Sequence, residues 1–278
     1  MASVSVVSAS TAKDTHNPDV GLRAHNLFYT KNPPPFTKTA ALTTRKVVYS
    51  GSSFAPKPVI LPDKKVPFWP FRSGIDCAAA KCVALTFDDG PSEETSKLLD
   101  LLKAKDIKAT FFVLGLQIEK YPLMLPRMLA EGHEIGNHTY HHKSLKKLSA
   151  ADVATEVNST QNLIFSLTGY LPHIIRPPMG EFNLGDPTLA NYPIILWSAD
   201  PWDWKYRNSA TIDQEVMKQV KPGYIVIMHD IYPTSIGAVP TIIDTLKQQG
   251  YTFVTISELF GWQDESAPLP AGQVLRAR

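Results

Sequence analysis

Several features are scarce or missing in this 278-residue chain, and each excludes a class of protein. No run of 18 apolar residues occurs, so the sequence predicts no membrane-spanning helix. The formal net charge is only +2, which argues against a dedicated nucleic-acid-binding protein. The N-terminus, MASVSVVSAS, lacks the basic start and apolar core of an intact signal peptide. A truncated exported protein and a cytosolic protein would both begin in this way.

Cysteine is also rare. The two cysteines, Cys77 and Cys82, lie close together in the segment CAAAKC. This spacing differs from the two-residue spacing of zinc-binding pairs, and no second pair exists, so the cysteines predict no zinc site. In an exported protein the pair could close a small loop as a disulfide, and two free thiols are the alternative.

Proline and positive charge are concentrated in residues 1–75. This segment holds nine of the 23 prolines, and ten Lys and Arg against three Asp and Glu. Such a proline density excludes long helices and central strands, so we expect an irregular basic extension. Within it KVVYS (46–50) is a short strand candidate, and the aromatic VPFWPF (66–71) is expected to pack on the main domain. The extension is either a solvated spacer or a contact to an anionic surface such as a cell wall.

From about residue 80, short apolar runs alternate with amphipathic segments, which predicts an α/β fold with a parallel sheet covered by helices. One helix is expected to begin after Ser149 and end at Gly169. The apolar runs span residues 82–87, 109–115, 133–139, 173–178, 193–199, 224–230 and 252–258. We assign residues 76–265 to this domain and 266–278 to a C-terminal tail. Ligands of such folds bind at the carboxyl ends of the strands.

Ionisable residues follow several of these runs. Asp88 and Asp89 end the first run, in LTFDDGP; adjacent carboxylates indicate a nearby cation or a proton to be moved, or a solvated turn. After the third run, in NHTYHH, a helical turn would place His138 and His142 on one face, four residues apart. Two imidazoles and one of the aspartates make a metal site with open positions, as in zinc hydrolases.

A hydrolase also needs an acid for the leaving group. His229, at the end of the sixth run, is the candidate acid, and Asp203 is expected to orient it. Arg176 would hold a carboxylate by a bidentate pair, or serve as a structural ion pair. Trp204 would form an apolar wall against a sugar. Four residues near these motifs are not expected to take part in catalysis. Asp200 would cap a turn, and Trp202 would pack or face the substrate. His133 and His141 are expected to have no role in the site.

Five motifs, TFDDGP, HTYHH, RPPMG, DPWDW and IMH, occur in this order over residues 80–260. The set resembles the polysaccharide deacetylases of carbohydrate esterase family 4, also called the NodB-homology domain. The resemblance implies a distorted (β/α) barrel of seven or eight parallel strands. It also implies one divalent metal ion, usually Zn²⁺, with Co²⁺ or Ni²⁺ as substitutes.

The resemblance also implies a role for each motif residue. Asp88 would be the base, held by Arg176, and His229 the acid, tuned by Asp203. The metal ligands would be Asp89, His138 and His142. Trp204 and Ile227 would line the acetyl pocket, and a main-chain N–H of RPPMG would hold the oxyanion. Further substrate contacts are expected from Tyr140, Pro178, Met179 and Gly180; Met179 stands where many relatives have tyrosine.

The implied activity is hydrolysis of N-acetyl groups on β-1,4-linked N-acetylglucosamine polymers, with release of acetate. Peptidoglycan ranks first as substrate, and chitin or chitooligosaccharides second. The alternatives are an acetylxylan esterase, a catalytically dead carbohydrate-binding relative, and an intracellular hydrolase of small amides. We expect a monomeric protein that is extracellular or associated with the cell wall.

Overall fold

The computed structural model describes residues 2–5, 46–50, 74–262 and 269–278. The chain divides into two compact units, Met1–Ala55 and Pro56–Arg278. In the first unit, β1 (Ala2–Ser5) pairs antiparallel with β2 (Lys46–Ser50), so the predicted strand at 46–50 is present. The expected packing of VPFWPF lies outside the described residues.

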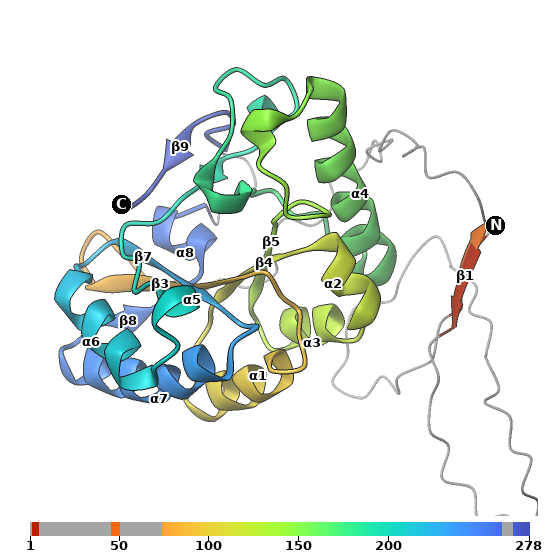
Figure 1. Cartoon of the computed structure of the whole chain (residues 1–278). Coiled ribbons are helices and arrows are strands. Elements are labelled where there is room, and N and C mark those ends of the chain that lie inside the picture. The colour runs from red at the N-terminus through yellow and green to blue at the C-terminus, as the bar shows by residue number, and fades with distance from the viewer. Residues whose placement is uncertain (1, 6–45, 51–73, 263–268) are drawn as a thin grey trace, which may run out of the picture. The chain divides into compact units, whose positions relative to one another are not determined.

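The second unit is built on a parallel sheet (Figure 1). Its strands are β3 (Cys82–Asp88), β4 (Thr110–Val113), β5 (Glu134–Asn137), β7 (Tyr224–His229) and β8 (Thr252–Phe253). The order is β5-β4-β3-β7, and β8 pairs with the beginning of β3. All these pairings are parallel, which confirms the predicted α/β class.

Parallel pairing continues beyond this sheet through single bridges and the short strand β6 (Ile194–Ile195). The bridges are Asn137 with Ile175, Ile175 with Ile194, and Ala199 with Val226. Through these bridges, β5 connects to Ile175, then to β6 and the segment after it, and finally to β7. The resulting ring of strands is the distorted barrel. The run 173–178, expected as a full strand, is reduced to the bridge at Ile175, because the prolines that flank it lack the N–H that a strand donates.

Side chains of β3 alternate between two hydrophobic cores. Val83, Leu85 and Phe87 pack with buried helix residues such as Leu98 and Val239 in the larger core. Cys82 and Ala84 face a second core with Phe112, Ile195 and Ile225 inside the barrel. Because both faces are buried, the strand reads as a continuous apolar run. The alternation also sends Thr86 and Asp88 to the inner side.

Helices connect and cover the strands. Ser149 accepts the N–H of Asp152 at the start of α4, and Gly169, with φ 72°, ends it, as predicted. The first helix starts at Thr95, and ahead of it the Ser92 hydroxyl accepts the N–H of Glu94. The helices are α1 (Thr95–Ala104), α2 (Gly115–Lys120), α3 (Met124–Ala130), α4 (Ala150–Thr168), α5 (Asp203–Tyr206), α6 (Ser209–Gln219), α7 (Pro233–Gln248) and α8 (Ile256–Phe260). Short 3-10 turns span Leu145–Lys147, Pro178–Gly180 and Leu189–Asn191. Within the described part of the chain, no helix is long and apolar enough to cross a membrane.

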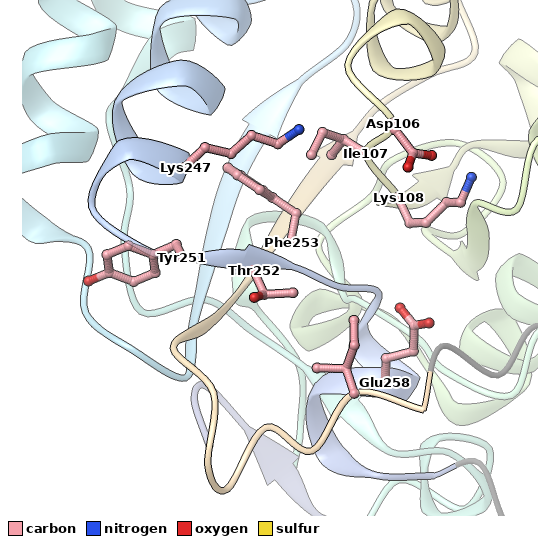
Figure 2. Close-up of a pocket in the computed structure, with 9 residues that line it drawn as sticks. Asp106, Ile107, Lys108, Lys247, Tyr251, Thr252, Phe253 and Glu258 are labelled. Atoms are coloured by element: carbon pink, nitrogen blue, oxygen red, sulfur yellow. The ribbon is translucent and has the colours of Figure 1, made fainter.

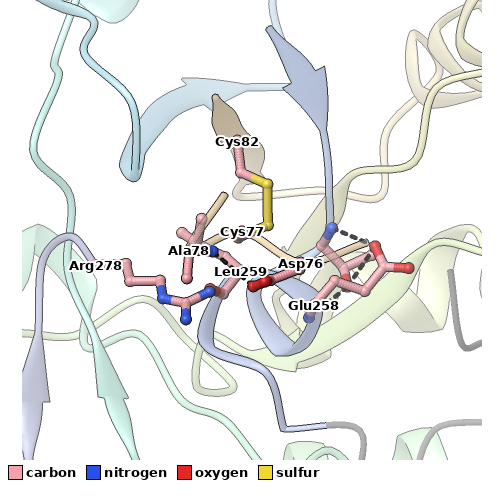
Figure 3. Close-up of a disulfide and its surroundings, with 8 residues drawn as sticks. Asp76, Cys77, Ala78, Cys82, Glu258, Leu259 and Arg278 are labelled. Carbon is pink, nitrogen blue, oxygen red and sulfur yellow. Dashed lines mark hydrogen bonds between the residues drawn. A yellow bond between two sulfur atoms is a disulfide. The ribbon is translucent and has the colours of Figure 1, made fainter. Parts of the chain in front are cut away.

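Within the described part of the second unit, the segment before β3 and the C-terminal residues are both held to the domain. Cys77 and Cys82 form a disulfide with a Cα–Cα distance of 5.4 Å (Figure 3). At the other end, β9 (Val274–Leu275) pairs with β6, and the guanidinium of Arg278 donates to the carbonyl of Leu259 at 3.1 Å. Of the tail expected at 266–278, residues 269–278 are described, and within them Val274 and Leu275 pair with β6.

A cavity of about 370 Å³ lies beside β8 (Figure 2). Its lining includes Ile107, Lys108, Tyr251 and Phe253. Because β8 pairs with Cys82 and Val83, the cavity is at the beginning of β3, whereas the ionisable motifs follow the strand ends. About six residues of extended chain, roughly 20 Å, separate the two ends, so the cavity is not part of the candidate site.

Candidate active site

The register of the parallel strands brings the first and last motifs together. Asp88 lies opposite His229 in the pairing of β3 with β7. Asp89 follows β3 directly, and His138 follows β5. Strand ends that are about 50 to 140 residues apart in sequence therefore lie at one edge of the sheet, as the sequence predicts for a parallel sheet.

Asp89, His138 and His142 form a cluster that is suited to a cation. The Oδ1 atom of Asp89 lies 3.4 Å from Nε2 of His138 and 3.2 Å from Nε2 of His142. Potential ligand atoms of all three lie within 4.8 Å of one another. The Oδ1 atom is buried and has no hydrogen-bond partner among the described residues. A buried carboxylate oxygen without a donor is costly, and a cation held with the two imidazoles would satisfy it.

The histidines converge for a reason other than the predicted helical turn, which is absent. After β5 the chain forms a loop in which Thr139 has φ 72° and His142 has φ 57°. The carboxylate of Glu156, on α4, accepts the N–H groups of Tyr140 at 3.1 Å and His141 at 2.8 Å. This anchor folds the loop back, so that the rings of His138 and His142 lie 5.2 Å apart.

Glu156 is a site residue that the sequence analysis missed. It is 3% exposed and contacts the imidazole of His141 at 2.9 Å and the ammonium of Lys143 at 3.1 Å. A usable signal was present, because Glu156 lies on the buried face of α4 with Val153 and Val157. A carboxylate at an apolar helical position indicates a buried partner.

Asp88 is held by a fully buried arginine. The guanidinium of Arg176 donates to Oδ1 of Asp88 at 2.6 Å and to the hydroxyl of Thr86 at 2.8 Å. Its other donors reach the carbonyls of Ile195 and Leu196. The expected bidentate pair is thus wrong, since one nitrogen contacts one carboxylate oxygen. The other oxygen, Oδ2, lies 3.7 Å from Nε2 of His138, toward the cation cluster.

The main-chain carbonyl of Arg176 also orients the imidazole of His138. The carbonyl of Arg176 lies 2.6 Å from Nδ1 of His138, and this bond requires a proton on Nδ1. In the neutral form of the ring, Nε2, which faces Asp89, is then the unprotonated nitrogen. A lone pair directed at the cluster is what a metal ligand needs.

His229 is paired with the buried carboxylate of Asp203. Nδ1 of His229 lies 2.7 Å from Oδ1 of Asp203. Oδ2 accepts the main-chain N–H of His229 at 2.8 Å and the hydroxyl of Ser235 at 2.5 Å. Burial by itself would lower the pKa of His229, but the bond and charge of Asp203, with Asp88 and Asp89, raise it to about 9. The imidazole therefore carries its proton at neutral pH.

The carboxyl group of Asp89 is ionised at neutral pH. Burial would raise the pKa of Asp89, but the imidazoles of His138, His142 and His229 outweigh it and lower the pKa to about 2. Burial lowers the pKa of His142. A charged carboxylate and an unprotonated imidazole are the forms in which both residues bind metal ions.

The residues expected at the substrate surface differ in exposure. Trp204 and Met179 are 49% and 54% exposed, whereas Ile227 and Pro178 are buried. In the short turn Pro178–Gly180, Met179 has φ 58° and Gly180 has φ 67°. Tyr140 is half-buried, and its ring would collide with any side chain at position 115, where the chain has glycine.

The other residues near the motifs lie as follows. Asp200 accepts the N–H of Trp202 at 2.8 Å, which is the expected turn cap. Nδ1 of His133 accepts the N–H of Ala109, and burial lowers the pKa of this histidine to about 3. The exposed Trp202 packs edge-on against Tyr206, an exposed aromatic that the sequence analysis did not single out.

A carboxylate and two imidazoles in one cluster, with a second carboxylate and a protonated imidazole beside them, make the arrangement found in metal-dependent hydrolases. The profile of the family described as Polysaccharide deacetylase matches residues 76–190. A peptidoglycan-N-acetylglucosamine deacetylase of Bacillus cereus is 36% identical over 192 residues, which cover 66% of this chain and 90% of that protein. The chain belongs to the polysaccharide deacetylases of carbohydrate esterase family 4.

Similar proteins from two bacteria share the catalytic unit. The peptidoglycan-N-acetylglucosamine deacetylase PgdA of Listeria monocytogenes is 45% identical over 182 residues, which cover 65% of this chain and 39% of PgdA. The peptidoglycan-N-acetylmuramic acid deacetylase PdaC of Bacillus subtilis is 45% identical over 180 residues, 64% of this chain and 38% of PdaC. The match thus spans about two fifths of these relatives' own length.

A solved structure, described as T48 deacetylase with substrate, is also similar. Its TM-score is 0.69 at 43% identity, and the match covers 72% of this chain and 99% of that chain. The likeness therefore extends over the whole of that domain.

Proposed function

We propose that this protein hydrolyses N-acetyl groups of β-1,4-linked N-acetylglucosamine polymers and releases acetate. The observation that carries the proposal is the cluster of Asp89, His138 and His142, with Asp88 and His229 beside it at the same edge of the sheet. A base and an acid beside a cation site are the groups that amide hydrolysis requires.

The residues of the cluster would hold one divalent ion, for which the His₂-carboxylate set suits Zn²⁺. When bound, the ion would supply positive charge to the acetamide carbonyl and to the attacking water. Asp88 takes the proton of that water at Oδ2, because Oδ1 is already bonded to Arg176. The bond of Oδ1 to Arg176 fixes the orientation of the carboxylate, with Oδ2 on the side of the cation cluster.

His229 gives its proton to the departing amine. Asp203 holds the imidazole so that Nε2, the atom farther from the carboxylate, carries the transferable proton. Tetrahedral collapse leaves a free amine on the sugar, and acetate as the second product.

The main chain of RPPMG offers one donor for the oxyanion. Pro177 and Pro178 have no N–H group, and the N–H of Gly180 already donates to the carbonyl of Pro177. The N–H of Met179 is the remaining donor of the PPMG segment. A main-chain donor makes the side chain at this position secondary, so methionine is compatible with the role.

The substrate is proposed from the relatives and from the surface beside the acid. Both relatives act on peptidoglycan by name, one on each of its two sugars, so we place peptidoglycan ahead of chitin. Trp202, Trp204 and Tyr206 expose 38 to 49% of their surface, and aromatic rings stack on sugar faces. Such a protein works outside the cell or in the cell wall.

The test is acetate release from peptidoglycan, chitooligosaccharides and acetylated xylan, measured on the purified protein before and after metal removal and Zn²⁺ return. We expect activity on a glycan that contains N-acetylglucosamine, lost with the metal and restored with it. The Asp88→Asn variant should lose roughly 10²–10⁴-fold in rate. The exposed Asp244, paired with Lys105, offers a matched control, since Asp244→Asn should stay within about twofold. Glycan binding without acetate release, or activity that survives metal removal, would contradict the proposal.

A further inference from the structure

We propose that Asp230 is a positioning residue that holds the turn of Asp88 and Asp89 in register with the strand end of His229. No motif in the sequence analysis assigned a role to it. The inference rests on the proposed function, because it concerns the placement of the base and a metal ligand relative to the acid.

Asp230 is hydrogen-bonded to the segment that follows the turn, at Ser92 and Thr95. It is fully buried and comes directly after His229 at the end of β7. Its Oδ2 accepts the hydroxyl of Thr95 at 2.5 Å, and its main-chain carbonyl accepts the hydroxyl of Ser92 at 2.6 Å. Thr95 in turn accepts the N–H of Ser92 at 2.7 Å. Side chain and main chain of one residue thus fix the chain just beyond Asp89.

The carboxylate of Asp230 also lies close to Gly90, in the turn itself. A Cβ atom at Gly90 would lie 2.2 Å from Oδ1 and 2.3 Å from Oδ2 of Asp230, so only glycine fits there. On its other side, the carbonyl of Gly90 accepts the N–H of Leu114 at 2.9 Å. The residue after Asp89 is therefore clamped between Asp230 and the start of α2.

The burial of the Asp230 carboxyl lowers the stability of the fold, and a purely structural role for this residue does not explain it. Oδ1 of Asp230 has no hydrogen-bond partner in the described part of the chain. Burial, together with the charges of Asp89 and Asp88, raises the pKa of Asp230 to about 7. A buried carboxyl with an unsatisfied oxygen near two other carboxylates is unfavourable for folding. Its retention is expected where it places reacting groups, because small displacements of such groups lower the rate strongly.

The test measures Zn²⁺ affinity of the metal-free protein by chelator competition, together with kcat and KM. Asp230→Ala should weaken Zn²⁺ binding by roughly 10- to 100-fold, the range typical for residues that orient ligands. We expect kcat to fall by a similar factor, with little change in KM. Asp230→Asn keeps the shape and an acceptor for Thr95, so it should stay within about fivefold of the unmodified protein.

A double-mutant cycle isolates the contact with Gly90. Gly90→Ala alone should impair Zn²⁺ binding, because its Cβ displaces the carboxylate. In the Asp230→Ala background the same change should add little, since the carboxylate is gone. Leu246→Ala is the control for lost stability, because Leu246 is buried in α7 about 13 residues, or roughly 20 Å, beyond the helix start next to the site.

The proposal is overturned if Asp230→Ala lowers thermal stability as Leu246→Ala does but leaves Zn²⁺ affinity and kcat unchanged. Simple addition of the Gly90→Ala and Asp230→Ala effects would also overturn it, as would a protein that binds no Zn²⁺ at all. If Zn²⁺ affinity responds as expected but no glycan is deacetylated, the proposed function fails and the role of Asp230 in placing the ligand stands.

Discussion

Replacing Asp203 with asparagine should move the alkaline limb of the pH–rate profile to lower pH. The carboxylate lies 2.7 Å from Nδ1 of His229, whose side chain is only 14% exposed. Burial alone would lower the pKa of this imidazole, and Asp203 is the largest cause that raises it. An amide has the same shape without the charge, so it removes that cause with little change in packing.

The size of the effect follows from the two pKa values. The ordinary value of 6.5 and the value of about 9 in this site differ by roughly 3 kcal/mol, because one pKa unit is about 1.4 kcal/mol. Without the carboxylate charge we expect a pKa at or below 6.5. At pH 8 about 90% of the unmodified protein but only about 3% of the variant would hold the proton, a difference of roughly 30-fold in kcat/KM. A bound cation lowers both values, so the difference between the proteins is the prediction.

The assay is acetate release from pH 5 to 10, for both proteins loaded with the same metal, with the imidazole titration followed by NMR. Unfolding gives an independent check. Because the pKa of His229 is raised in the folded state, its contribution to stability is complete below pH 6.5 and is lost as pH rises through about 9. The difference in unfolding free energy between the proteins should shrink over this window. An alkaline limb that stays in place in Asp203→Asn would refute the assignment of His229 as the acid.

Three further perturbations have expected outcomes. Glu156→Ala should release the loop of His142 and weaken Zn²⁺ binding by about 10- to 100-fold, whereas Glu156→Gln should retain most of the affinity; equal loss in both would point to charge instead of loop anchoring. Arg176→Met should lower the free energy of unfolding by about 3–5 kcal/mol in denaturant titrations, because it leaves the buried Asp88 unpaired, and adding Asp88→Asn should recover part of this loss. Cys77→Ser should cost roughly 2 kcal/mol of stability, the value for so short a loop, with acetate release at 25 °C unchanged; a large loss of activity would mean that the disulfide shapes the site.

The sequence by itself determined the class of fold and the composition of the site. The strand β3 is buried on both faces, so its apolar run was continuous and readable without any partner. The ends of α4 at Ser149 and Gly169 are local capping interactions, which depend on residues only a few positions apart. The ionisable residues were visible because they lie at or after the ends of apolar runs, and parallel strands bring their carboxyl ends to one edge.

Only the tertiary structure decided how these residues meet. His138 and His142 converge because Glu156 on another element folds their loop, and no local periodicity encodes that anchor. Arg176 meets Asp88 through a single nitrogen because carbonyls of a neighbouring strand take its other donors. The contact of Asp230 with Gly90 joins residues 140 positions apart through the register of β3 and β7. The hydrophobic pattern of the sequence indicates which residues are buried. Strand register and side-chain packing determine which residues contact each other, so these contacts are known only from the folded structure.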